Sequence, residues 1–308
     1  MAISEGGVQA QDATAVLVNY NSGGRLEHLL DLLTEEVRAI VVVDNASSDG
    51  SLSPAERRAG TQVIRNEVNR GFAAAVNQGA VVGETEWLLL VNPDAHIRRG
   101  DVTRLLSGVP EDVAAIAPLQ VDEAARPRSE TGGFEPSLFR YLVWAVLPVR
   151  FHRGFGPWLA PPFPTADTDV DWVSGALLGI RRHVFVRLGG LDERYFLYHE
   201  DVDFARRARK LGYRILCRPT VRLFHEVAHG EPSRRVASGL RSVESLSLDF
   251  SGWRRRALGL VLGLGYGLRA MFATGTTRDL SRAVLPQCRR LIRGEPAVAG
   301  PQSLRKSP

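Results

Sequence analysis

The residue types and spacing of the triplet Asn92-Pro93-Asp94 suggest chemistry more clearly than the polar clusters that precede it in the chain. It follows the strongly apolar run Trp87–Val91, so the end of a buried strand would present an amide and a carboxylate together. Such oxygen ligands suit Mg²⁺ or Mn²⁺, with a diphosphate and water completing the shell. The alternative is a turn with Pro93 at its corner. His225 could complete the same metal shell, or could be an ordinary packed or surface histidine.

A second set of carboxylates lies in the stretch GGLDERYFLYHEDVDF. Glu200 and Asp201 stand where a helix is expected to begin, and acidic residues there can simply complement the helix dipole. The competing interpretation is a general base, one carboxylate aimed at an acceptor hydroxyl. Adjacent helical residues point in different directions, so the two acids are not expected to share one task.

Polar residues after the other apolar runs could contact a nucleotide. Asp44 could accept hydrogen bonds from a base or a ribose, or could only tie down a turn. The segment from Asn69 to Phe72 combines a glycine with a helix start, where backbone N–H groups can bind a diphosphate. The candidate nucleotide and donor contacts are Asn19, Tyr20, Asn21, Asp44, Asn45, Asn69, Gly71, Phe72, Asn77 and Asn92.

A sheet is needed to bring these clusters together. Short apolar runs alternate with helical stretches over residues 13 to 118, which predicts a mostly parallel α/β sheet covered by helices. Ligands of such sheets bind beyond the carboxyl ends of the strands, where the polar clusters fall. The predicted strands are Ala13–Asn19, Ala39–Asp44, Thr61–Arg65, Trp87–Val91 and Val113–Ala117, and the predicted helices are Arg25–Leu33, Phe72–Val82 and Asp101–Ser107.

This alternation of strands and helices is lost between about residues 120 and 168, where prolines such as Pro136, Pro148 and Pro157 predict a loop-rich insertion facing a substrate. Periodicity then returns. The predicted elements are the apolar run Trp172–Ile180, a helix from Arg182, a helix from about Asp201 to Leu211, and strands near Arg214–Cys217 and Val221–Phe224.

Composition limits the class of protein. The chain has 308 residues, 44% of them apolar, enough for a sizeable core. Cys217 and Cys288 show no metal or disulfide pattern. The N-terminus lacks the features of a signal peptide, and no run reaches the ~18 apolar residues of a membrane span. A cytoplasmic protein is expected, with peripheral attachment to the inner face of the cell membrane left open.

The net charge of +5 is concentrated near the C-terminus. Residues 234 to 293 hold twelve arginines against three acidic residues. Within them, Trp253-Arg254-Arg255-Arg256 precedes an apolar, glycine-rich stretch that could lie at an anionic membrane surface, or could be a packing helix or a dimer contact. Nucleic-acid binding is not expected, because no recognisable module accompanies the charge. The oligomeric state is left open.

Six segments taken together resemble the family 2 glycosyltransferases of the GT-A fold, especially the rhamnosyltransferase-like branch. They are VNYNSGGRL, VVVDNASSDGS, NRGFAAAVNQG, LLLVNPDA, the stretch from WVSGALLG to ARKLGY, and FHEVAHGEPS, collinear over about residues 14 to 233. The resemblance implies a Rossmann-like GT-A domain at 1–240, with a nucleotide-binding half at 13–118 and an acceptor-side half at 119–240. A basic helical tail at 241–293 and a flexible end at 294–308 would follow.

The resemblance also implies roles for particular residues. Asn19 and Asn21 would lie beside a uridine or thymidine nucleotide, Asp44 would contact the base, and Asn69 with Gly71 would line the ribose and diphosphate. Asn92 occupies the first aspartate position of the family's Asp-x-Asp motif, so Asp94 is the expected metal ligand, joined by His225. Asp201 matches the catalytic base, with Glu200 beside it. Trp172, Gly175 and Ala176 would line the acceptor and donor-sugar pocket.

The implied reaction is an inverting transfer of a sugar, rhamnose from dTDP-rhamnose being favoured over UDP-sugars, to a glycan or polyprenyl-linked acceptor in cell-surface polysaccharide synthesis. Mg²⁺ or Mn²⁺ is the implied cofactor. Two alternatives are a non-catalytic nucleotide-sugar-binding scaffold, for which Asn92 gives some ground, and a nucleotidyltransferase. The first strand is followed by NYNSGG rather than GxGxxG, which argues against a dinucleotide-dependent oxidoreductase.

Overall fold

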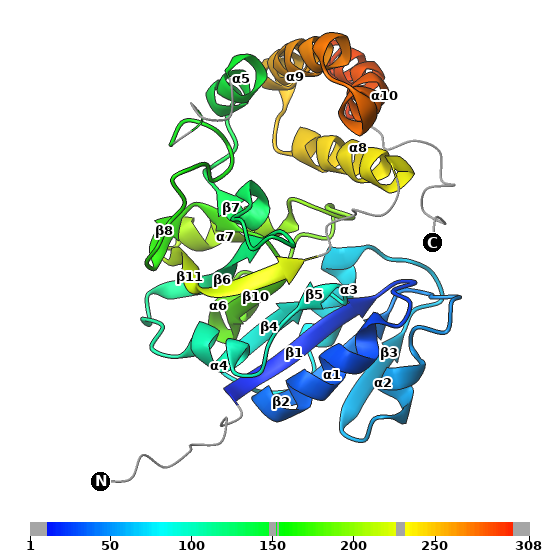
Figure 1. The fold of residues 1–308 in the computed structure, drawn as a ribbon, viewed down its shortest axis with the longest axis vertical. Coiled ribbons are helices and arrows are strands. Elements are labelled where there is room, and N and C mark those ends of the chain that lie inside the picture. The colour runs from blue at the N-terminus through cyan, green and yellow to red at the C-terminus, as the bar shows by residue number, and fades with distance from the viewer. Residues whose placement is uncertain (1–10, 148–151, 153, 226–231, 298–308) are drawn as a thin grey trace.

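A computed structural model of the protein describes residues 11–147, 152, 154–225 and 232–297. Within these residues a nine-stranded sheet forms the centre of the molecule (Figure 1). A separate pair, β7 (Gly132–Gly133) and β9 (Trp172–Val173), lies beside it. The nine strands are β1 (Gln11–Asn19), β2 (Val37–Asp44), β3 (Thr61–Arg65), β4 (Trp87–Val91), β5 (Ala95–His96), β6 (Val113–Val121), β8 (Thr168–Val170), β10 (Leu177–Arg181) and β11 (Arg214–His225).

The strand order is β3-β2-β1-β4-β10-β6-β11-β5, with β8 added beside β11. Strands β3, β2, β1 and β4 are mutually parallel, and β10 runs antiparallel between β4 and β6. The prediction of a mostly parallel sheet is therefore confirmed. The prediction of two separate strands near Arg214–Cys217 and Val221–Phe224 is wrong, because both segments belong to the single strand β11. The register of the pairing between β11 and β6 shifts between Arg218 and Arg222, and the two strands remain paired on both sides of the shift.

Helices cover both faces of the sheet, as the helical stretches between the strands predict. On one face, Leu26, Leu30 and Leu33 of α1 pack with strand residues such as Leu17 and Val42. On the other face, α3, α6 and α7 pack on β4 and β10. The helices of this part are α1 (Arg25–Glu36), α2 (Ser53–Arg57), α3 (Phe72–Ala80), α4 (Asp101–Leu106), the 3₁₀ turn η1 (Ser129–Thr131), α5 (Leu138–Val146), α6 (Arg182–Arg187) and α7 (Glu200–Lys210).

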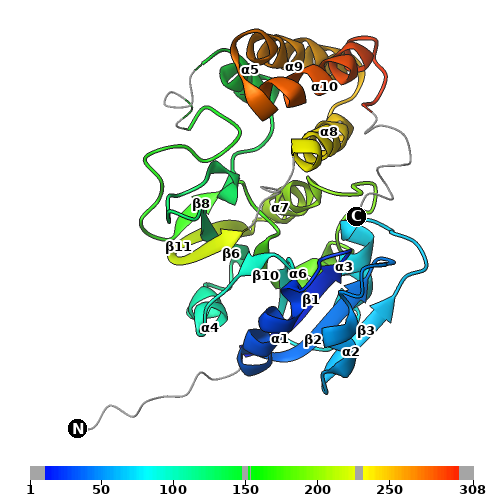
Figure 2. The same ribbon diagram turned by 45° about the vertical axis from the view of Figure 1, so that its right-hand side comes forward.

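The C-terminal helices form a second body with its own core. They are α8 (Pro232–Leu248), α9 (Gly252–Phe272) and α10 (Gly275–Ile292), and Figures 1 and 2 both show them at the end of the molecule away from the first strands. Their apolar residues cluster with Tyr141 of α5. The expected domain boundary at residue 240 falls inside α8, and most of the expected flexible end, from residue 298, lies outside the described residues.

The helix α5 corrects one part of the expected loop-rich insertion, because it is a regular helix within residues 120 to 168. That the insertion faces a substrate stays a prediction. The N-cap of α5, Ser137, accepts a hydrogen bond from the N–H of Arg140, and the flanking prolines stand outside the helix. Gly265 of α9 lets the two helices touch, because a β-carbon there would lie 2.7 Å from the Trp144 ring. The insertion thus packs on the C-terminal helices. Among the described residues, none of the helices combines the length and apolar character that crossing a bilayer demands.

Candidate active site

Asp44 and Asn19 meet at the carboxyl ends of two parallel strands. The register of β1 and β2 pairs them directly, and the Asn19 amide donates a hydrogen bond of 2.8 Å to the Asp44 carboxylate. The second Asp44 oxygen accepts the N–H of Ser47 at 3.1 Å. Both side chains are buried. We call this arrangement of Asn19, Asp44 and the Ser47 loop the Asp44 corner.

A cavity of about 370 Å³ opens beside the Asp44 corner. A volume of this size lies within the range of small-molecule sites. One wall carries the Asp44 carboxylate and another carries Asn66, whose amide donates to Asn45 at 2.9 Å. The cavity is lined by Asp44, Ala46, Ser47, Gly50, Leu52, Ser53, Glu56, Arg65 and Asn66. The corner therefore offers a shaped space with hydrogen-bond acceptors at its wall.

The start of α3 joins the Asp44 corner to the chain before α7. Gly71 has a φ of +89° and a β-carbon there would lie 2.6 Å from the Phe196 carbonyl oxygen, so glycine is required twice over. The N–H of Phe72 donates to that same oxygen at 2.7 Å. The Asn45 amide donates to the Gly71 carbonyl at 3.2 Å, and Asn69 accepts the Gly71 N–H at 2.9 Å. The start of α3 thus contacts both Asn45 and the chain before α7.

Asp94 and His225 come together although 131 residues separate them. Strand β5 pairs with the end of β11 and sets His225 opposite Ala95. The His225 Nε2 atom then lies 3.0 Å from an Asp94 oxygen and 3.3 Å from the Asn92 amide nitrogen. The other ring nitrogen is buried and has no hydrogen-bond partner among the described residues. We call Asn92, Asp94 and His225 the Asp94 corner.

The Asp94 corner fits a divalent cation. The His225 Nε2 atom and an Asp94 carboxylate oxygen lie 3.0 Å apart, a separation that suits two ligands of one ion. The Asp94 side chain is more exposed than that of His225. In the described part of the chain there is no cluster of three or more His, Cys, Asp or Glu residues suited to a metal. The protein would supply two or three donors, and a diphosphate with water would supply the others.

Glu200 and Asp201 begin α7 but face different surroundings. Asp201 is half-buried, and its carboxylate accepts the N–H groups of Gly175 at 3.1 Å and Val202 at 2.8 Å. Glu200 is buried, and one of its oxygens lacks a hydrogen-bond partner within the described ranges. Burial raises the pKa of both groups, and the charge of Asp201 raises the pKa of Glu200 further. We call these two acids with Gly175 the Asp201 corner.

Backbone contacts bring the three corners close together, and we call the region between them the crevice. Gly175, which donates to Asp201, precedes Ala176, whose carbonyl accepts the N–H of Asn92 at 2.9 Å. Tyr198 lies between the same corners. Burial raises its pKa, and the charges of Glu200 and Asp94 add to that rise. A β-carbon on Gly175 would lie 3.8 Å from the Phe72 ring. Asp201, Asn92 and the start of α3 are therefore neighbours.

Two residues expected at the crevice are used elsewhere. The Asn77 amide exchanges hydrogen bonds of 2.9 Å with the backbone N–H and carbonyl of Leu191, so its polar atoms hold the loop between α6 and α7. Trp172 belongs to the buried core, and its indole N–H donates to the Phe134 carbonyl at 3.2 Å. Both residues were expected to contact a ligand because of their positions in the sequence motifs. In the structure these polar groups instead form hydrogen bonds within the fold.

Other expected residues lie where the strand ends predict. Tyr20 and Asn21 follow β1, and Asn21 accepts the N–H of Ser48 at 2.8 Å. The sequence interpretation missed the hydroxyls that surround Asn19. Its amide also donates to Ser51 at 2.9 Å and Ser47 at 3.0 Å. The signal was present, because both serines lie in the loop that directly follows Asp44.

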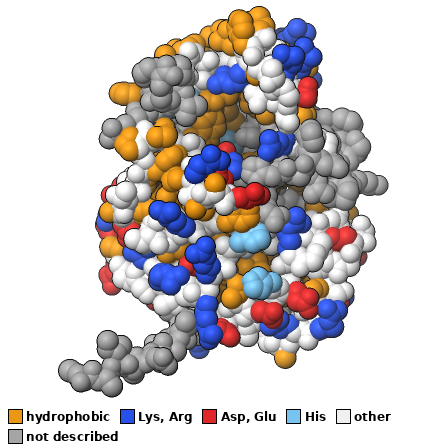
Figure 3. All heavy atoms as spheres, viewed as in Figure 1, with side chains coloured by type: hydrophobic (Ala, Val, Ile, Leu, Met, Phe, Trp, Pro, Cys, Tyr) orange, Lys and Arg blue, Asp and Glu red, His pale blue; other side chains and the backbone are white. Residues whose placement is uncertain are grey.

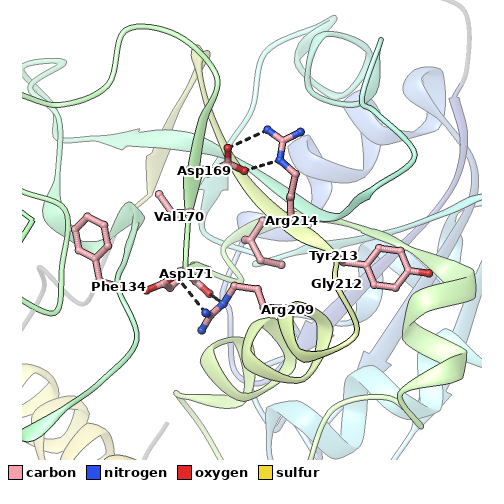
Figure 4. A pocket seen from close by; sticks show the side chains of 9 residues that line it. Phe134, Asp169, Val170, Asp171, Arg209, Gly212, Tyr213 and Arg214 are labelled. Carbon is pink, nitrogen blue, oxygen red and sulfur yellow. Dashed lines mark hydrogen bonds and ion pairs between the residues drawn. The ribbon is translucent and has the colours of Figure 1, made fainter.

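A second cavity, of about 290 Å³, lies away from this crevice (Figure 4). It opens at the amino end of β11, whereas Asp44 and His225 stand at the carboxyl ends of β2 and β11. Its charged groups pair with each other: Arg214 binds Asp169 with two hydrogen bonds of 2.8 and 2.9 Å, and Arg209 lies 3.2 Å from Asp171. These pairs leave the cavity without the converging carboxylates that the crevice has.

Comparisons with known proteins agree with this geometry. Residues 14–143 match the family model "Glycosyl transferase family 2". The N-acetylglucosaminyl-diphospho-decaprenol L-rhamnosyltransferase of Mycobacterium tuberculosis is 31% identical, over 87% of this chain and 94% of its own length. Rhamnosyltransferase WbbL of Escherichia coli is 26% identical, over 71% of this chain and 84% of its own. A mannosyltransferase structure from Pyrobaculum calidifontis, with GDP-Man and Mn²⁺, has the same fold at 17% identity, with a TM-score of 0.52 over 93% and 88% of the two chains.

Proposed function

This chain belongs to glycosyl transferase family 2 as a rhamnosyltransferase-like member, and from that membership we propose how its crevice works. It transfers a sugar, with rhamnose from dTDP-rhamnose as the favoured donor, to a hydroxyl of a polyprenyl-linked glycan in the synthesis of cell-surface polysaccharide. The observation that carries the proposal is the chain of backbone contacts from Asp201 through Gly175 and Ala176 to Asn92. It sets a base candidate and a metal candidate on one crevice.

The Asp44 corner receives the base of the donor nucleotide. Asp44 is held by Asn19 and by the Ser47 N–H, so its carboxylate is rigid before the ligand arrives. A thymine or uracil presents an imide N–H that a fixed carboxylate can accept, which favours these bases. The diphosphate then extends toward the start of α3, where the positive end of the helix dipole suits an anion. The N–H groups of Gly71 and Phe72 already donate to Asn69 and Phe196, so the attraction at this turn comes from the dipole.

Asp94 and His225 would hold a divalent cation, with the Asn92 amide beside them. When bound, Mg²⁺ or Mn²⁺ neutralises negative charge on the departing nucleoside diphosphate. The structure of the Pyrobaculum mannosyltransferase contains Mn²⁺, and the pairing of a carboxylate with an imidazole suits Mn²⁺ well. The substitution of Asn92 for an acid leaves one carboxylate here, which weakens the expected affinity without removing the site.

Asp201 acts as the general base. The acceptor oxygen attacks the anomeric carbon as its proton passes to Asp201, and the bond from that carbon to the diphosphate oxygen breaks with its electron pair. One displacement from the opposite face inverts the configuration. Burial raises the pKa of both acids. Asp201 is the one suited to act as the base, because two N–H donors stabilise its charged form, whereas one Glu200 oxygen has no partner among the described residues.

The C-terminal helices attach the enzyme to an anionic membrane surface, where a lipid-linked acceptor would be found. Four apolar side chains of α9 repeat every four or seven residues, so they form one stripe, and they are 45% to 72% exposed: Trp253, Leu260, Leu264 and Met271. Exposed arginines such as Arg282 and Arg289 of α10 lie nearby. Figure 3 shows hydrophobic side chains along this end of the molecule with basic ones beside them. Each arginine near anionic lipid adds about 1 kcal/mol.

Flotation with vesicles of phosphatidylcholine and phosphatidylglycerol tests this attachment. Wild-type protein should float with the vesicles, and the double variant Leu260→Glu/Leu264→Glu should stay in the dense fraction because it places charge on the apolar stripe. Val81→Glu is the control, since Val81 is 84% exposed on the nucleotide-binding half. Equal recovery of the double variant and the wild type would remove α9 from this role.

The transferase activity is tested with purified protein, Mn²⁺, and a panel of dTDP-, UDP- and GDP-sugars, each with a short-chain polyprenyl-diphosphate-linked acceptor. We expect release of the nucleoside diphosphate and a glycosylated lipid of inverted anomeric configuration, with dTDP-rhamnose giving the fastest turnover. A protein that binds the donors and releases no nucleoside diphosphate with any acceptor would instead fit the non-catalytic scaffold.

A further inference from the structure

We propose that Asp249, in the link between α8 and α9, is a positioning residue for the catalytic helix α7, an inference that rests on the proposed function. Its carboxylate is 4% exposed and is surrounded by side chains from one short stretch of chain. It accepts the Tyr195 hydroxyl at 2.6 Å and both terminal nitrogens of Arg206 at 3.1 Å. The His199 Nδ1 atom lies 3.5 Å away. These partners lie on both sides of Glu200 and Asp201.

The chain just before Asp201 needs such support. Tyr198 and His199 both have a φ of +69°, a left-handed conformation that side chains with a β-carbon rarely adopt. Residues in that region persist only where their surroundings hold them, and they cluster at functional sites. The backbone turn they make sets the direction in which α7 starts, and therefore where the Asp201 carboxylate points.

Helix α8 supports the same segment at further points. The Ser245 hydroxyl donates to the Leu197 carbonyl at 2.8 Å, and the Arg241 guanidinium stacks 5.0 Å from the centre of the Phe196 ring. The carbonyl of Phe196 in turn accepts the N–H of Phe72. The segment from Tyr195 to His199 is thus held between α8 and the start of α3, and Asp249, in the link that follows α8, adds a buried acidic anchor.

The charge on Asp249 is matched by its partners. Burial alone would raise its pKa, but hydrogen bonding and charge from His199 and Arg206 lower the pKa well below its usual value. Arg206 also donates to Glu135 at 2.5 Å, so the network reaches the insertion that carries α5. The C-terminal helices are therefore part of what shapes the crevice, in addition to any role at a membrane.

The test compares Asp249→Asn with Asp167→Asn in the full-length protein. Both variants weaken a bidentate ion pair to an arginine, but the Asp167 pair with Arg218 lies away from α7. We expect Asp249→Asn to lower kcat at least tenfold while the Kd for dTDP stays within twofold of wild type. Asp167→Asn should leave kcat within twofold. Tyr195→Phe, which removes one hydrogen bond without stranding a charge, should lower kcat by a smaller factor.

Amide hydrogen exchange gives a readout that does not depend on turnover. Exchange should accelerate over residues 196 to 203 in Asp249→Asn and remain unchanged in β1 and β2. A kcat within twofold of wild type in Asp249→Asn, or a kcat that falls only in step with dTDP binding, would overturn the proposal. If wild-type protein itself releases no nucleoside diphosphate, the transferase proposal fails, and unchanged exchange over residues 196 to 203 would still refute the positioning role.

Discussion

The Asp44 corner and the Asp201 corner hold their carboxylates in different surroundings. At Asp44 the contacts come from two adjacent strand ends and the loop that follows them, and both oxygens have donors. At Asp201 both oxygens also accept N–H groups, from Gly175 and Val202, but two left-handed residues precede the helix. The adjacent buried acid, Glu200, has one oxygen without a hydrogen-bond partner among the described residues. Satisfied contacts make a rigid binding site, whereas unsatisfied, strained groups are typical of reactive sites. The comparison predicts that the first corner binds and the second reacts.

Asp201→Asn should give the largest effect and separates the two corners most clearly. Loss of a general base lowers turnover by about 10² to 10⁴-fold, and the amide still accepts the Gly175 N–H, so the fold is retained. We expect kcat to fall by this amount with an unchanged Kd for dTDP. Asp203→Asn is the matched control, because Asp203 lies on the same helix in an ion pair with Arg207. Normal turnover in Asp201→Asn would show that Asp201 is not the general base.

Asp94→Ala should rank second, because it removes the carboxylate of the metal candidate between the two corners. Turnover is expected to fall by about 10²-fold, the usual scale for losing one group that stabilises developing charge. Chelation of wild-type enzyme with EDTA should abolish turnover, and Mn²⁺ should restore it. His225→Ala should raise the Mn²⁺ concentration needed for half-maximal activity, whereas His96→Ala, at a neighbouring exposed histidine, should not. Full activity in EDTA would contradict a metal at Asp94.

Asp44→Asn should have the smallest effect of the three and should act on binding. The substitution replaces a charged acceptor with a neutral one, and the loss of such a hydrogen bond raises the KM for the donor by about tenfold. We expect kcat to stay near wild type. Asp12→Asn, at the opposite end of β1, serves as control. A variant with normal KM and a depressed kcat would reverse the division of roles between the corners.

The same contrast explains what could be predicted from the sequence. Strands β3 and β4 have the expected bounds. For β4 the signal is local, because its five-residue apolar run ends in a polar cluster. The residues alone left the meeting of Asp94 with His225 as one of two alternatives, and the family resemblance favoured it. Helix α5 was not predicted, because the prolines around it indicated irregular chain. Its packing partner, α9, lies more than a hundred residues later and gave no local signal. Asp249 carried no local signal at all, because its partners lie 43 to 54 residues earlier in the chain.

The central claim is that one crevice joins the nucleotide pocket, the metal ligands and the base. A crystal structure of the protein with dTDP and Mn²⁺ tests it most directly. The account predicts the thymine against Asp44, the ion on Asp94 and His225, and the Asp201 carboxylate facing the open side of the β-phosphate. A nucleotide bound elsewhere, or protein atoms filling the space between the β-phosphate and Asp201, would contradict it.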